Sequence, residues 1–149
     1  MRFLLVDRIA DHVPDTSIQG WKNVAMAEDY LEWHFPERPI MPGVLILEAC
    51  VQLAGWLEAG SSAFERWFLL DHVRTARYYD FATPGDRIDI TLTRIEDDNP
   101  ERRVYRAETS VDGKRGASIE FEGCVTPLTD LEDRDRARRT WAQLRGEHA

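Results

Sequence analysis

The chain has 149 residues, of which 43% are hydrophobic and 31% are charged, and its formal net charge is −8. This length and composition suit one folded domain and leave little room for a second. The acidic balance argues against nucleic-acid binding, because contact with a phosphate backbone requires clustered Lys and Arg.

The first third of the chain predicts two strands followed by a stiff loop. Short apolar segments at 3–6 and 18–27 have the character of strands. Three prolines within positions 36–42 then exclude both a regular helix and a central strand. His34 therefore lies at the start of a loop with restricted flexibility.

A helix is predicted from Gly43 to about Ala59. Pro42 stands at its start, where the missing N–H costs no hydrogen bond. The helix is apolar on almost every side, which is typical of a helix buried at the centre of a fold. Glu48 and Gln52 interrupt its apolar run, which is shorter than the about 20 residues of a membrane span, so we expect no membrane association.

The rest of the chain predicts an antiparallel sheet. Strand patterns separated by turn sequences recur at 67–79, 87–96, 103–111 and 117–125. About five or six strands and one buried helix fit an α+β fold, in which a curved antiparallel sheet wraps around the helix.

The last segment, 130–149, is rich in charge and is expected to extend the 1–129 domain as a helix or a partly disordered tail. Trp141 and Leu144 are the residues that would attach it to the domain. The histidines other than His34 match no catalytic motif, and we expect them at the surface or in turns.

The two cysteines indicate neither a metal site nor a disulfide. Cys50 and Cys124 lie in no Cys-x-x-Cys pair and in no Cys/His cluster. Cys50 lies within an apolar run and is expected to be a small buried side chain. The absence of a disulfide pattern and of a signal-peptide pattern favours a cytoplasmic location.

Glu48 carries the first chemical signal, because it is a carboxylate in the middle of a helix that should be buried. Gln52 lies one helical turn further on the same face, so the two side chains can meet. A buried Glu needs partners or a raised pKa, and a raised pKa suits a general acid. From these residues alone, a structural Glu satisfied by Gln52 and backbone donors remains an equal alternative.

His34 supplies the second signal, since histidine is the usual proton carrier near neutral pH. Its loop runs directly into the helix start, where the amides of Gly43 and Val44 are free and the helix dipole favours negative charge. Such a start can hold a developing enolate oxygen, and the missing side chain of Gly43 would let a carbonyl approach. A base, an acid and an oxyanion site thus gather at one helix end.

The segment that joins these residues closely resembles a known signature. His34-Phe35-Pro36-x-x-Pro39-Ile40-Met41-Pro42-Gly43 and the following Val-Leu-Ile-Leu-Glu48-Ala-x-x-Gln52 are similar to the motif of FabZ-type 3-hydroxyacyl-(acyl carrier protein) dehydratases. Weaker similarity extends over roughly 3–127, at 3–8, 22–24, 77–86 and 111–114.

The resemblance implies a hot-dog fold and an active site between two protomers of a homodimer or a trimer of dimers. His34 of one chain would remove the α-proton of the thioester, and Glu48 of the other would help to protonate the departing hydroxyl. The amide of Gly43 would bind the thioester oxygen and Gln52 would orient Glu48. The remaining expected substrate contacts are Phe35, Val44 and Tyr78.

The same resemblance implies a substrate and no metal or organic cofactor. The acyl chain would be carried on the phosphopantetheine of an acyl carrier protein, or on CoA, and would lie in an apolar tunnel under the helix. The FabA-type branch, which also isomerises the double bond, has Asp where this chain has Glu48. We therefore expect dehydration alone, in fatty-acid synthesis or a related specialised acyl-chain pathway.

Three departures from the family pattern leave alternatives open. Trp33 replaces a glycine before His34, and we favour its packing on the sheet over its narrowing the entrance. Glu37-Arg38 replaces a glycine of the loop, and Tyr79-Asp80 replaces a basic pair suited to carrier contacts. One alternative is a non-catalytic hot-dog subunit that binds a carrier or partners an active paralogue. Another is thioester hydrolysis, which the fold also hosts.

Overall fold

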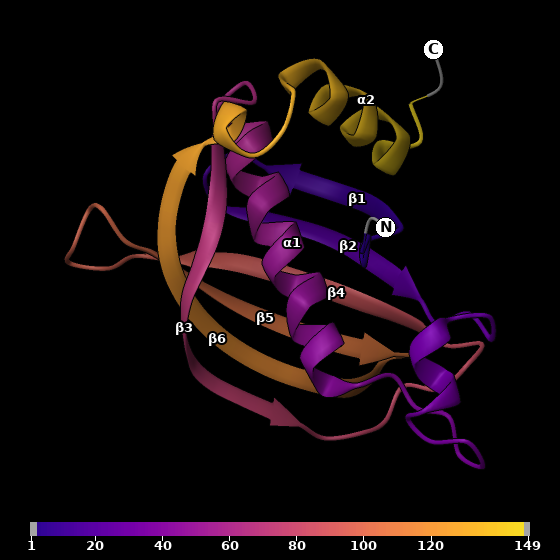
Figure 1. The fold of residues 1–149 in the computed structure, drawn as a ribbon. Helices are drawn as coiled ribbons and strands as arrows, with labels where there is room; N and C mark the ends of the chain where they lie inside the picture. The colour runs from indigo at the N-terminus through magenta and orange to yellow at the C-terminus, as the bar shows by residue number, and fades with distance from the viewer. Residues whose placement is uncertain (1–2, 148–149) are drawn as a thin grey trace.

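The computed structural model describes residues 3–147 and shows one curved sheet wrapped around a long helix (Figure 1). Neighbouring strands of the sheet are all antiparallel. Their order across the sheet is β1 (Arg8–Val13), β2 (Ser17–Asn23), β4 (Arg87–Ile95), β5 (Arg103–Val111), β6 (Lys114–Pro127) and β3 (Arg66–Tyr78). The predicted α+β hot-dog fold is confirmed.

The central helix, α1 (Gly43–Ser61), lies across the concave face of the sheet (Figure 1). It ends two residues beyond the predicted end, and every residue from Leu53 to Ala59 is buried. Its first turns are more open, and Val44 is 69% exposed. By length and composition alone α1 would suffice to cross a membrane, but its burial in the sheet accounts for its apolar sequence.

The first strand differs from the prediction. The run at 3–6 is not a strand, although Leu5 and Val6 are buried, and the chain enters the sheet only at Arg8. The sequence of β1 has no regular alternation, because its pairing with β2 slips between Ile9 and Asp11. β2 ends at Asn23, four residues before the predicted end of the second strand.

The last hairpin extends β6 beyond its predicted start. Asp112 and Gly113 both adopt positive φ, of 49° and 78°, the conformation that a two-residue hairpin turn requires. The strand therefore resumes at Lys114, immediately after the turn, and continues to Pro127.

The core contains a buried carboxylate that the sequence analysis did not identify. Glu58 in α1 is 1% exposed. Its carboxylate accepts hydrogen bonds from Tyr105 Oη at 2.6 Å and from the Nε atoms of Arg66 and Arg103, each at 3.1 Å. This cluster joins the helix to β3 and β5, and burial together with the neighbouring Glu58 raises the pKa of Tyr105. Cys50 is fully buried as predicted, and burial raises the pKa of its thiol to about 12.

After β6 a short 3-10 turn (Leu128–Asp130) leads to the helix α2 (Arg134–Arg145). The carboxylate of Asp133 caps its start by accepting from the Arg136 amide. Leu144 is buried, and Trp141 packs edge-on against His12 with 5.1 Å between ring centroids. His12 is thus a half-buried residue of β1, and its expected surface position is wrong. His148 lies outside the described residues.

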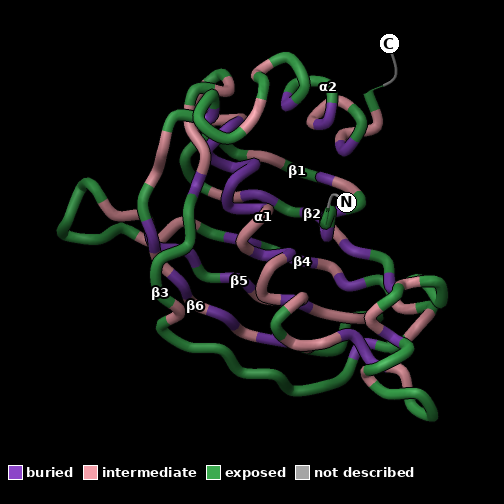
Figure 2. The backbone as a smooth tube through the Cα atoms, viewed as in Figure 1, coloured by how far each residue is buried: buried purple, intermediate pink, exposed green. Residues whose placement is uncertain are grey.

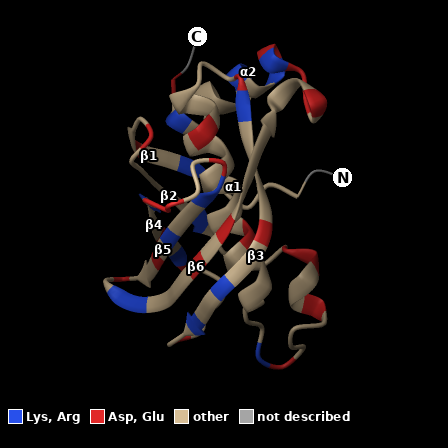
Figure 3. Cartoon of the chain, turned by 90° about the vertical axis from the view of Figure 1, so that its left-hand side faces the viewer, with Lys and Arg blue, Asp and Glu red and all other residues tan. Residues whose placement is uncertain are grey.

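The outer side of the sheet is polar, with basic and acidic residues interspersed over β3 and β6 (Figure 3). Arg74 alone pairs with Asp97, Glu120 and Glu122. These ion pairs neutralise the charges of the outer face against one another.

Candidate active site

His34 lies just after a 3-10 turn (Asp29–Glu32), on a loop that its own backbone fixes. Its amide donates to the Tyr30 carbonyl at 3.1 Å, and its carbonyl accepts from the Ile40 amide at 2.9 Å. The His34–Phe35 peptide is cis, and the two rings stack with centroids 4.4 Å apart. Phe35 is half exposed beside the histidine.

The ring of His34 is oriented by one further contact. Nδ1 lies 3.0 Å from the carbonyl oxygen of Ile40. A carbonyl can only accept, so Nδ1 carries the hydrogen of the neutral ring and Nε2 keeps its lone pair. The loop thus presents Nε2 as a base.

Two anchors hold this loop to the rest of the domain. The Met41 amide donates to the Ala82 carbonyl at 2.8 Å, which joins the loop to the segment after β3. At the other end Lys22, 5% exposed, pairs with Glu28 at 2.6 Å and Asp7 at 3.5 Å. The sequence analysis assigned Lys22 no role, although a buried lysine held by two carboxylates fixes the segment that leads to His34.

Glu48 projects from the second turn of α1 and is held by Gln52. Nε2 of Gln52 donates to Oε1 of Glu48 at 3.0 Å and to the Phe3 carbonyl at 2.9 Å, while its Oε1 accepts from the Leu5 amide at 2.9 Å. Glu48 is half-buried, so the expectation of a fully buried carboxyl is wrong for a single protomer. Among the described residues, its second oxygen, Oε2, has no hydrogen-bond partner.

The start of α1 presents free amides. The amides of Leu45 and Ile46 both donate to the Pro42 carbonyl, at 3.0 and 3.2 Å. Those of Gly43 and Val44 have no partner within the described chain, as expected at a helix start. They form a donor pair at the positive end of the helix dipole.

Tyr78, at the end of β3, covers this helix start. Its hydroxyl donates to the Gly43 carbonyl at 2.7 Å, and a Cβ on Gly43 would lie 2.9 Å from the Tyr78 Cζ atom. The room beside Gly43 is therefore filled by the tyrosine ring, which corrects the expectation that a substrate carbonyl uses it. Burial raises the pKa of Tyr78.

The protomer brings some of the predicted site residues together and leaves others apart. It joins Glu48 to Gln52 and Tyr78 to Gly43, but no hydrogen bond links His34 to Glu48 within the described residues. Trp33 is 81% exposed, so the expectation that it packs on its own sheet is wrong. Tyr79, which departs from the family pattern, has its ring centroid 4.2 Å from the guanidinium carbon of Arg115.

The strand that carries Tyr78 is also the most open part of the sheet. β3 lies at the edge and is mostly exposed along its length (Figure 2). Leu69 and Leu70 on this strand are each 39% exposed.

Comparison with known proteins shows the family of this chain. Residues 1–128 match the model of the FabA-like domain. The chain belongs to the FabA-like family. A relative named 3-hydroxyacyl-[acyl-carrier-protein] dehydratase FabZ, from Nitratidesulfovibrio vulgaris, is 35% identical over 134 residues, covering 87% of this chain and 85% of the relative. A FabZ from Aliarcobacter butzleri is 37% identical over 128 residues, covering 82% and 86%.

Solved structures support the fold of this FabA-like chain. A hot-dog-like protein from Thermanaerovibrio acidaminovorans superposes with a TM-score of 0.64 at 19% identity, covering 85% of this chain and 93% of that one. The dehydratase heterocomplex ApeI:P from Xenorhabdus doucetiae gives 0.59 at 14% identity, covering 76% and 92%. At such identities the similarity concerns the fold alone.

Proposed function

We propose that this FabA-like chain dehydrates a 3-hydroxyacyl thioester, carried on an acyl carrier protein, to the trans-2-enoyl thioester. The observation that carries the proposal is the fixed orientation of two proton-transfer groups. The carbonyl of Ile40 accepts a hydrogen bond from Nδ1 of His34, so that Nε2 is available as a base. The amide of Gln52 donates to Oε1 of Glu48 and leaves Oε2 free. Membership of a family with relatives named for this reaction supports it.

The chemistry follows from these positions. Nε2 of His34 takes a proton from C2 of the acyl chain, and negative charge develops on the thioester oxygen. The free amides at the start of α1 stabilise that charge. Glu48, as the general acid, gives a proton to the C3 hydroxyl as the C3–O bond breaks and water leaves, and the proton held by His34 then passes to the Glu48 carboxylate, which restores both groups. The side chains of Phe35, Val44 and Tyr78 contact the acyl chain of the substrate.

The site requires a second copy of the chain. The proposed homodimer pairs the exposed edges of two β3 strands, because a long unpaired edge with exposed Leu69 and Leu70 is a ready pairing surface. His34 of one protomer then faces Glu48 of the other. A trimer of such dimers is the alternative assembly, and sedimentation analysis distinguishes the two.

Residues 1–129 are proposed as the catalytic unit and 130–149 as an extension attached through α2. A cytoplasmic location suits an enzyme that acts on carrier-bound chains. The pathway is proposed to be fatty-acid synthesis or a related specialised acyl-chain synthesis, with CoA as the alternative carrier.

Mass spectrometry of a 3-hydroxyacyl carrier protein tests the reaction. Incubation with the wild type should remove one water, whereas His34→Ala and Glu48→Gln should not. Glu37→Gln, the same change on the exposed part of the loop, is the matched control and should retain activity. No mass change with any acyl chain on carrier protein or CoA would contradict the proposal and favour a non-catalytic subunit. Release of free thiol would instead indicate hydrolysis.

A further inference from the structure

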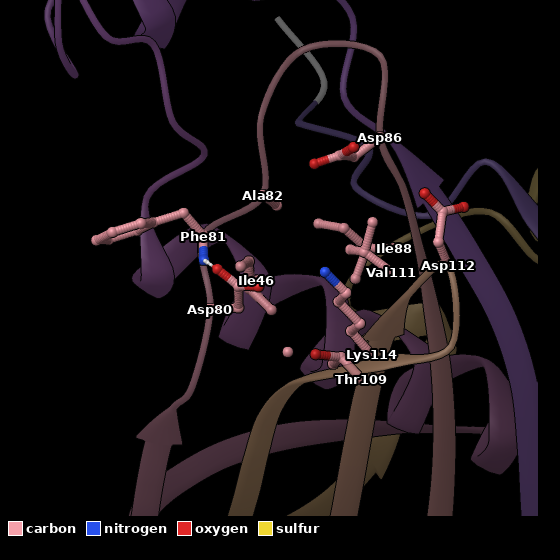
Figure 4. A pocket seen from close by; sticks show the side chains of 11 residues that line it. Ile46, Asp80, Phe81, Ala82, Asp86, Ile88, Thr109, Val111, Asp112 and Lys114 are labelled. Carbon is pink, nitrogen blue, oxygen red and sulfur yellow. Dashed lines mark hydrogen bonds between the residues drawn. The ribbon is translucent and has the colours of Figure 1, made fainter.

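A cavity of about 210 Å³ lies against α1, and Figure 4 shows the side chains that line it. One wall is Ile46, which lies on α1 between Gly43 and Glu48. Another is Ala82, whose carbonyl accepts the Met41 amide of the catalytic loop. The helix that carries Glu48 and the segment that anchors the catalytic loop thus both line this cavity.

Most of the inner wall of the cavity is apolar. Ile46, Ala82 and Ile88 are 6%, 3% and 2% exposed. The cavity is large enough to hold several non-hydrogen atoms of a ligand. These properties suit the far end of a short acyl chain.

Thr109, on β5, is the polar exception within this wall. It is 3% exposed, and its hydroxyl has no hydrogen-bond partner among the described residues. Among residues 3–147, the polar side-chain atoms that are fully enclosed and lack a hydrogen-bond partner belong only to Tyr30, Arg102 and Arg134. The Thr109 oxygen is therefore not sealed off, and it remains open to the cavity that the residue lines (Figure 4).

Access to that oxygen depends on Gly116, a neighbouring lining residue on β6. A Cβ at Gly116 would lie 2.8 Å from Oγ1 of Thr109. Any other residue would crowd the hydroxyl, so the glycine keeps its approach free. The φ of Gly116 is not among the positive ones, so its role here is space.

The rim of the cavity is predominantly acidic. Asp80, Asp86 and Asp112 line it beside a single amine, that of Lys114. Asp86 also accepts from the amide and hydroxyl of Thr83 at 2.8 and 3.1 Å, which holds it at the rim. A chain end that carries a free carboxylate is disfavoured by this charge.

We propose that the cavity selects 3-hydroxyacyl chains with a second, uncharged oxygen, a hydroxyl or a ketone, near the far end. This inference rests on the proposed dehydration. The oxygen of such a chain pairs with the Thr109 hydroxyl, whereas a plain alkyl end leaves that buried hydroxyl unpaired. A site built around a hydrogen bond discriminates against the analogue that lacks it.

The test compares matched pairs of 3-hydroxyacyl pantetheine thioesters, each a straight chain and the same chain with a hydroxyl near its end, over a range of lengths. With wild-type protein, kcat/KM should favour the hydroxylated member by about tenfold at the length that reaches Thr109. Thr109→Val removes the hydroxyl at similar volume and should abolish the preference. Gly116→Ala keeps the hydroxyl but crowds it and should do the same.

Thr93→Val, the same change at an exposed position of β4, is the control and should keep the wild-type preference. Melting temperatures establish that each variant is folded. Dehydration with equal kcat/KM for both members of every pair, or an unchanged preference in folded Thr109→Val, would overturn the inference and leave the dehydratase intact. Absence of dehydration with every substrate would overturn the proposed function and this inference with it.

Discussion

The side-chain amide of Gln52 lies 3.0 Å from the carboxylate of Glu48, and the same nitrogen lies 2.9 Å from the Phe3 carbonyl. Its oxygen accepts from the Leu5 amide, so the amide plane cannot flip without losing bonds on both sides. Gln52 therefore presents a donor to Glu48 and fixes which carboxylate oxygen stays free. The orientation of the proposed acid depends on the segment that precedes β1.

Gln52→Met tests this positioning, because it keeps the volume of the side chain and removes the amide. We expect kcat for dehydration to fall by about tenfold to a hundredfold, with KM nearly unchanged. The unpaired Leu5 amide should also cost about 1–3 kcal/mol of stability. Gln19→Met, at an exposed position of β2, is the control. A loss in KM alone would show that Gln52 binds substrate and does not position Glu48.

Gly43→Ala tests the fit between the helix start and Tyr78. The added Cβ would meet the tyrosine ring at 2.9 Å, and such overpacking typically costs about 1–3 kcal/mol. Chemical denaturation should show this loss in Gly43→Ala and a smaller one when it is combined with Tyr78→Ala. Equal losses in both backgrounds would show that the ring is not the cause.

The buried carboxylate of Glu58 gives the largest stability prediction. Glu58→Gln removes the charge that Arg66 and Arg103 share, and breaking a buried ion pair costs about 3–5 kcal/mol. The melting temperature should fall sharply. Glu65→Gln, which affects an exposed pair with Arg134, should change stability by no more than about 1 kcal/mol. Similar effects of the two substitutions would contradict a structural role for Glu58.

Glu48 and Glu58 also show what the sequence could and could not predict. Both are charged residues of one apolar helix, but Glu48 lies in its middle, where a carboxylate is conspicuous. Glu58 lies near the predicted end, where a charged residue is ordinary. Its partners Arg66, Arg103 and Tyr105 come from two strands, and only the folded sheet brings them to the helix.

The strands show the same limit. Those with regular alternation, such as β4 and β5, lie close to their predicted positions, because one face is buried at every second residue. β1 was missed since a shift in pairing interrupts its pattern. The role of Tyr78 in filling the room beside Gly43 also required the structure, since the two residues meet only across the fold.

His12 gives a pH-dependent prediction for the attachment of α2. Burial beneath Trp141 lowers the pKa of His12 from its ordinary value of 6.5. A hydrogen bond with the Leu57 backbone acts against this shift, nearby Arg145 adds to it, and the carboxylates of Asp11 and Asp15 oppose it. The unfolded chain therefore binds this proton at a higher pH than the folded chain does. The stability that neutral His12 contributes should be fully present above pH 6.5 and should be lost as the pH falls below that value.

Replacement of His12 by Gln removes this titration. As the pH is lowered from neutral to mildly acidic, the melting temperature of the wild type should approach that of His12→Gln, because the wild type loses stability that the variant does not. Loss of protection of the α2 amides in hydrogen exchange should accompany the decline in the wild type. His72→Gln, at an exposed position of β3, is the control and should follow the wild type. Parallel curves for wild type and His12→Gln would show that the proton has no effect on α2.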